Sequence, residues 1–148
     1  MTKDELRREI NFGLENLERI FQSIISFAAS DVSEDIKTSA IAFECLGYYN
    51  AIEHLILRIF KYLNIPKPAG ASSHRDTLRG FEMLLSEKRL SPSQEILEAI
   101  EDFMAFRHVA TNIYGFLVDW KKLCAVVAEI QSTHESIKQL LVELTNNL

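Results

Sequence analysis

Hydrophobic side chains return every three or four residues along most of the chain, the spacing that lines one face of an α-helix. Five segments show this pattern, and no stretch alternates hydrophobic and polar residues as a half-buried strand would. The segments run over residues 2–29, 31–63, 74–88, 91–114 and 119–144. The pattern therefore predicts an all-α protein, an antiparallel helical bundle of four long helices plus one short helix.

Several predicted helices have a recognisable start. Thr2 and Glu5 form a capping box, in which a hydroxyl and a carboxylate three residues apart satisfy the first free backbone N–H groups. Asp31 with Glu34 predicts a similar start for the second helix, and Asp119 predicts the cap of the fifth.

The fourth helix carries the fullest start signal of the five. Ser91 stands as the N-cap, Pro92 occupies the first helical position, and Gln94 supplies the residue that completes the box. The helix is expected to run to about Tyr114, where Gly115 ends it.

The second segment differs from the others because, from residue 40 onward, it is apolar on nearly every side. Such a helix is expected to be covered on more than one face, so we predict that it lies at the centre of the bundle. Residues 64–73 hold two of the three prolines and one of the five glycines, which predicts the longest loop. The segments on either side are too short to fold alone, so residues 1–148 are expected to form one domain.

Composition adds limits on function. The chain has 47% hydrophobic and 25% charged residues, which favours a folded core over disorder. Its net charge of −5 predicts no overall attraction to nucleic acid, so any RNA contact must be local.

Cys45 and Cys124 lie in apolar segments and are predicted to be core thiols. The charged N-terminus and the lack of a long apolar run predict a cytoplasmic protein without a membrane span.

Common catalytic motifs are missing. The sequence has no HExxH, no GxxxxGK[ST] and no glycine-rich loop after a strand, so a zinc protease, a P-loop enzyme and a dinucleotide-binding protein are disfavoured. No metal or cofactor is expected. His54 and His134 stand alone on predicted helices, where a histidine is more often structural than catalytic.

One stretch departs from the apolar pattern of its own helix. Residues 106–116, FRHVATNIYGF, bring a guanidinium, an imidazole, a hydroxyl, an amide and a phenol onto the end of the fourth helix. These groups belong to Arg107, His108, Thr111, Asn112 and Tyr114. Arginine suits phosphate oxygens, and histidine can transfer a proton near neutral pH. The alternative interpretation is a helix end whose polar residues simply face water.

Three segments of the chain resemble the HEPN superfamily, and within it the HepT-like proteins. The stretch RHVATNIYGFLVDW, residues 107–120, resembles the signature form RHxxRHxYGFxLDW. YNAIEHL, residues 49–55, resembles the YNGIERI of the family's second helix, and residues 68–78, ending in SHRDTL, resemble a PxGxxWHxxLL segment. The resemblance covers about residues 45–145, with the three segments in the same order.

The resemblance implies a metal-independent ribonuclease toxin that acts as a homodimer. In such proteins the signature arginine, matching Arg107, binds the scissile phosphate, and a histidine exchanges protons during attack by the RNA 2′-hydroxyl, which leaves a cyclic phosphate. The tyrosine matching Tyr114 is the residue to which an MNT-type nucleotidyltransferase antitoxin attaches AMP. Thr111 and His74 are further candidates for RNA contact.

The chain departs from the signature at the histidine, where it has Asn112. An amide does not titrate near neutral pH, so Asn112 can orient a phosphate or a water but cannot exchange a proton. His108, one turn earlier on the same face, is the nearest substitute. The asparagine is either natural or a change that disarms a toxic enzyme, and the sequence is compatible with both.

Three hypotheses follow. The first is a HepT-like toxin that cleaves RNA, weakened by Asn112 and silenced through Tyr114. The second is a catalytically inactive HEPN module that binds RNA, a nucleotide or a nucleotidyltransferase. The third is a plain helical interaction bundle whose apolar second helix contributes to a dimer interface.

Overall fold

The computed structural model describes residues 1–112 and 118–148, and its described part is built of five helices without a strand. They are α1 (Lys3–Ala28), α2 (Glu34–Tyr62), α3 (Ser73–Glu87), α4 (Gln94–Asn112) and α5 (Trp120–Asn146). The predicted all-α bundle of four long helices and one short helix is confirmed. No helix in the described ranges is long and apolar enough to cross a membrane.

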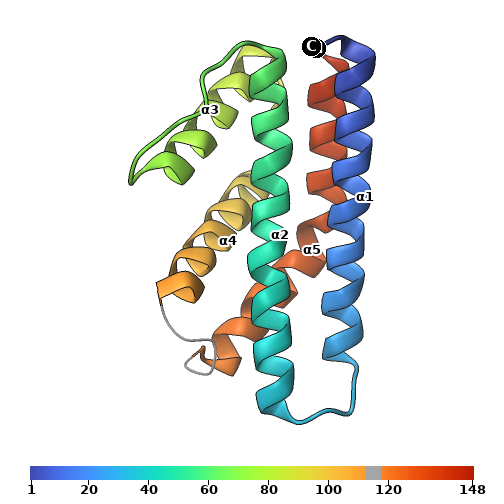
Figure 1. The fold of residues 1–148 in the computed structure, drawn as a ribbon, viewed down its shortest axis with the longest axis vertical. Coiled ribbons are helices and arrows are strands. Elements are labelled where there is room, and N and C mark those ends of the chain that lie inside the picture. The colour runs from blue at the N-terminus through green and yellow to red at the C-terminus, as the bar shows by residue number, and fades with distance from the viewer. Residues whose placement is uncertain (113–117) are drawn as a thin grey trace.

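The helix α2 stands in the middle of the bundle, as its apolar composition predicted. Figure 1 shows α1 and the C-terminal half of α5 along one side of α2, and α3 and α4 along the other. Tyr48, Ile52, Ile56 and Ile59 of α2 are completely buried. The helix is not covered along its whole length, however, because Phe43 near its beginning is 71% exposed.

The two ends of the chain lie beside each other (Figure 1), where the Lys3 ammonium group donates a hydrogen bond to the carbonyl of Leu148. Among the start signals, the Thr2–Glu5 capping box is confirmed, with both of its hydrogen bonds present. Asp119 also caps α5 as predicted, because its carboxylate accepts from the backbone N–H of Lys121.

Two other predicted starts are wrong. The cap of α2 is Ser33, whose hydroxyl accepts from the N–H of Ile36, so Asp31 lies before the helix. In α4 the hydroxyl of Ser93 accepts from the N–H of Ile96, and the helix begins at Gln94 rather than at Pro92. The predicted end of α4 at Tyr114 and Gly115 lies outside the described residues.

The two cysteines have different environments. Cys45 is buried in the core, as predicted, and burial raises the pKa of its thiol to about 12. Cys124 is exposed, so its prediction as a core thiol is wrong. The apolar residues around it, Leu123 and Val127, do face the core, and Cys124 lies beside that stripe.

Candidate functional site

The last two turns of α4 carry the polar residues that the sequence analysis singled out. Phe103 and Phe106 are buried and fix this part of the helix against the core. Arg107 is half-buried, whereas His108, Thr111 and Asn112 are exposed. The helix therefore presents the predicted group at the surface, with the arginine closest to the rest of the bundle.

Arg107 is held by α2. Its Nε donates a hydrogen bond of 2.9 Å to Oδ1 of Asn50, a residue 57 positions earlier in the chain. None of the ion pairs between described residues involves Arg107. Asn50 uses only the Nε–H of the guanidinium, and no other hydrogen bond joins this side chain to a described residue. Within the described ranges, the donors at its two Nη atoms are therefore available for an oxyanion.

His108 and Asn112 lie one turn apart on the exposed face, as the helical spacing predicted. The Asn112 amide donates to the backbone carbonyl of His108 at 2.7 Å, and its nitrogen is 3.4 Å from Nδ1 of the imidazole. Thr111 turns back to its own helix, where its hydroxyl donates to the carbonyl of Arg107. Of the four residues, Arg107 and His108 thus have charged or titratable groups available to a ligand.

Tyr114, the candidate for modification, lies outside the described residues. Its place relative to Arg107 and its role therefore stay predictions.

His74 lies in the first turn of α3 and is tied to α2. Its Nδ1 is 2.6 Å from Oε2 of Glu53, and the hydroxyl of Tyr49 donates to the same oxygen at 2.7 Å. The side chain of Glu53 is 12% exposed and that of His74 is 34% exposed. Burial, and after it the hydrogen bond to Glu53, raise the pKa of Tyr49 far above its ordinary value, so its hydroxyl keeps its proton.

Side chains of α2 therefore connect the three segments that carry the family resemblance. Asn50 contacts Arg107 of α4, and Glu53 contacts His74 of α3. Tyr49, Asn50 and Glu53 were not among the predicted site residues. The available signal was that these polar groups lie among the apolar residues of the central helix, where a buried polar group needs a partner.

The other histidines divide as follows. His134 is buried and structural, as predicted: its Nε2 is 3.1 Å from Glu18, its Nδ1 is 2.8 Å from the Tyr48 hydroxyl, and Phe21 stacks on the ring. Glu18, His134 and Glu135 bring their ligand atoms close enough for a metal ion. However, the ammonium group of Lys138 is 2.7 Å from Glu18 and already supplies the positive charge there. His54 is exposed on α2.

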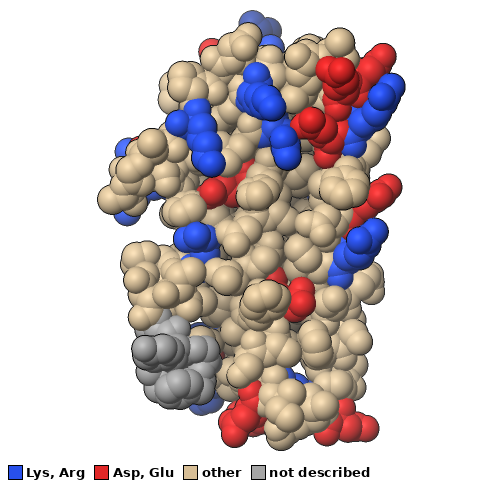
Figure 2. Space-filling model, viewed as in Figure 1, with Lys and Arg blue, Asp and Glu red and all other residues tan. Residues whose placement is uncertain are grey.

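Positive charge gathers locally despite the net charge of −5. Two adjoining hollows of about 490 and 350 Å³ share His54 and Arg58 of α2, and the cations Arg8, Lys61 and Lys67 also line them. Figure 2 shows most of the Lys and Arg side chains of this face in its upper half, where acidic side chains also lie, and further acidic side chains at its lower end. A local contact with RNA phosphates is thus compatible with the acidic composition.

Comparison with sequence models of protein families gives a match. A sequence model of a family described as HepT-like protein matches residues 40–148, which include most of α2 and all of α3, α4 and α5. No curated protein and no solved structure matches the chain. The matched range covers well over half of the 148 residues and contains all three segments that resemble the HEPN signature, so the chain belongs to the HepT-like protein family.

Proposed function

We propose that this chain is the toxin of a HEPN/MNT toxin-antitoxin pair and cleaves RNA without a metal ion. The observation that carries the proposal is the setting of Arg107. Its guanidinium is half-buried and fixed by Asn50, and no described carboxylate neutralises it. An oriented, uncompensated arginine is suited to binding a phosphodiester and to stabilising the negative charge that develops on it.

In the proposed reaction the RNA supplies its own nucleophile. The 2′-hydroxyl loses its proton and attacks the neighbouring phosphorus, the bond to the 5′-oxygen breaks, and that oxygen takes up a proton. The products are a 2′,3′-cyclic phosphate and a 5′-hydroxyl. Arg107 binds the phosphate, His108 exchanges a proton, and Asn112 donates a hydrogen bond that orients the substrate.

The proposed control acts through Tyr114. An MNT-type nucleotidyltransferase attaches AMP to its hydroxyl, which adds a bulky anion to a residue seven positions after Arg107 in the sequence. The adduct would block RNA and repel its phosphates. We further propose a homodimer in which Arg107, His108 and Asn112 of both chains line one cleft.

The experiment is cleavage of a labelled single-stranded RNA by the purified protein. We expect cleavage with a cyclic phosphate end, and its loss in Arg107→Ala but not in Arg79→Ala, which removes an exposed arginine of α3. Cleavage that survives Arg107→Ala would contradict the proposal. Intact mass after co-expression with the nucleotidyltransferase should show added AMP, and Tyr114→Phe should abolish the addition.

Asn112 favours a second candidate, a HEPN module that binds RNA, a nucleotide or the nucleotidyltransferase without cleaving. In that case RNA binds but stays intact, and Asn112→His introduces cleavage whereas Asn112→Gln does not, because only the imidazole transfers protons. If substitutions of Arg107 and Tyr114 change neither RNA binding nor partner binding, the plain interaction bundle is the better description.

A further inference from the structure

The pair formed by Glu53 and His74 has the geometry of a carboxylate–imidazole dyad. Nδ1 of His74 lies 2.6 Å from the Glu53 carboxylate, which is largely buried, and the Tyr49 hydroxyl donates to the same oxygen. A carboxylate can only accept hydrogen bonds, so Nδ1 carries the ring proton. The other nitrogen, Nε2, then has a free lone pair, and one third of the side chain is exposed to solvent.

Such a dyad does more than hold a histidine in place. The carboxylate fixes the ring orientation and tautomer, and it stabilises the imidazolium that forms when Nε2 accepts a proton. The hydroxyl of the buried Tyr49 donates to Glu53 and keeps this carboxylate oriented toward His74.

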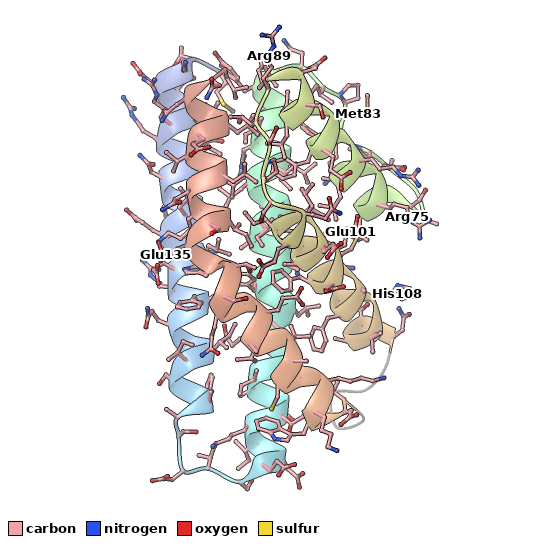
Figure 3. The ribbon with its side chains drawn as sticks, turned by 180° about the vertical axis from the view of Figure 1, so that it is seen from behind. Arg75, Met83, Arg89, Glu101, His108 and Glu135 are labelled. Carbon is pink, nitrogen blue, oxygen red and sulfur yellow. The ribbon has the colours of Figure 1, made fainter. Side chains whose placement is uncertain are left out.

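The dyad lies on the same side of α2 as the phosphate-binding arginine. Asn50, which holds Arg107, and Glu53, which holds His74, are three residues apart, and such residues are neighbours on a helix face. In Figure 3, Arg75, which follows His74, and His108, which follows Arg107, lie along the same edge of the molecule. The positive charge of Arg107 also acts on the Tyr49 hydroxyl, a member of the dyad's network.

The proposed reaction needs two proton transfers, from the 2′-hydroxyl and to the 5′-oxygen, and Asn112 can perform neither. We propose that the Glu53–His74 dyad is a catalytic acid/base pair of this chain, with Nε2 of His74 exchanging a proton with the RNA and Glu53 as its positioning residue. The inference rests on the proposed function. It identifies His74 as the residue that replaces the missing signature histidine in one of the two proton transfers. His108 then performs the other transfer.

His74→Asn is the discriminating variant, because the asparagine amide can replace Nδ1–H as the donor to Glu53 but has no counterpart of Nε2. We expect RNA cleavage under single-turnover conditions to fall about 100- to 10,000-fold. Binding of a 2′-O-methyl RNA, which cannot be cleaved, should stay unchanged. Glu87→Gln, a change at an exposed residue of the same helix α3, is the control and should cleave normally.

Glu53→Gln should reduce cleavage less than His74→Asn, because the imidazole remains but loses its charged support. If either variant unfolds at a lower temperature than the wild type, His74→Ala assayed with and without free imidazole decides the question, and rescue by imidazole supports the dyad. No rescue there, or full activity of a folded His74→Asn, overturns it.

The outcomes separate the two proposals. A wild type that cleaves, an inactive Arg107→Ala and an active His74→Asn would leave the proposed ribonuclease standing and remove the dyad from its mechanism. A wild type that leaves RNA intact would overturn both the cleavage and the catalytic role of His74.

Discussion

Glu18 connects the surface of α1 to the buried histidine of α5. It accepts from Lys138 at 2.7 Å and lies 3.1 Å from Nε2 of His134. The hydrogen bond from Lys138 is the largest cause that lowers the pKa of Glu18, to about 2. Because this carboxylate is more acidic in the folded chain than in the unfolded one, it stabilises the fold above its ordinary pKa, and the stabilisation is lost as pH falls toward 2.

We therefore predict that Glu18→Gln lowers the free energy of unfolding at pH 7 by about 1 kcal/mol, a modest value because water screens a carboxylate that is one-third exposed. The loss should shrink between pH 5 and pH 2, because the carboxylate of the unfolded chain takes up its proton near its ordinary pKa, above the pKa of about 2 in the folded chain. Urea unfolding at several pH values measures it. Glu15→Gln, at an exposed position of the same helix, is the control. An equal loss at pH 7 and pH 3 would contradict the assignment.

At the residue scale, the sequence predicted contacts within a helix better than contacts between helices. His108 and Asn112 are one turn apart, so helix geometry alone places their side chains next to each other. The contact of Arg107 with Asn50 spans 57 residues and depends on how α4 packs against α2. No local pattern encodes that packing, so Asn50 and Glu53 emerged only from the structure.

At the scale of the elements, two helices end on residues in the left-handed backbone conformation. Asn64 after α2 has φ = 57° and Arg89 after α3 has φ = 56°. In both places the next residue donates its N–H back to the last turn, from Ile65 to Phe60 and from Leu90 to Leu85. This is the Schellman arrangement, in which glycine is the usual residue because a Cβ atom disfavours the conformation.

Arg89→Gly is expected to stabilise the protein. It removes the Cβ strain, and Figure 3 shows the Arg89 side chain pointing away from the bundle, so little packing is lost. We predict a gain of about 1 kcal/mol, which for a chain of this size raises Tm by roughly 2–4 °C. Lys88→Gly is the control, because Lys88 has φ = −84° and gains no relief. Thermal unfolding followed by circular dichroism tests the difference, and a lower Tm for Arg89→Gly would refute it.

The helix starts show why boundaries are harder to predict than helices. Near α2 and near α4 the sequence offers two polar candidates two residues apart, Asp31 or Ser33 and Ser91 or Ser93. In both helices the later serine accepts the capping hydrogen bond. Asp and Ser are similarly good N-cap residues, so local preference does not decide between them. The position of the cap depends on how the preceding loop packs, which local sequence does not specify.

For the whole molecule, the proposed homodimer requires a face that meets a second copy. Exposed apolar side chains occur on several helices, and two of them mark alternative faces for this contact. Val109 lies on α4 beside the candidate site and is 42% exposed, whereas Phe43 lies near the beginning of α2 and is 71% exposed. Phe43 lines a shallow hollow with Phe27 and Ile36, formed by the hairpin of α1 and α2.

The proposed ribonuclease requires the first of these faces, because its cleft is formed by Arg107, His108 and Asn112 of two chains. We predict that Val109→Asp, which places a charge in that interface, shifts the protein from dimer to monomer in sedimentation analysis and abolishes RNA cleavage. Phe43→Asp changes a more exposed apolar residue and should leave both properties intact. If Phe43→Asp instead dissociates the dimer while Val109→Asp does not, the copies meet through the hairpin of α1 and α2, and each site would have to work within a single chain.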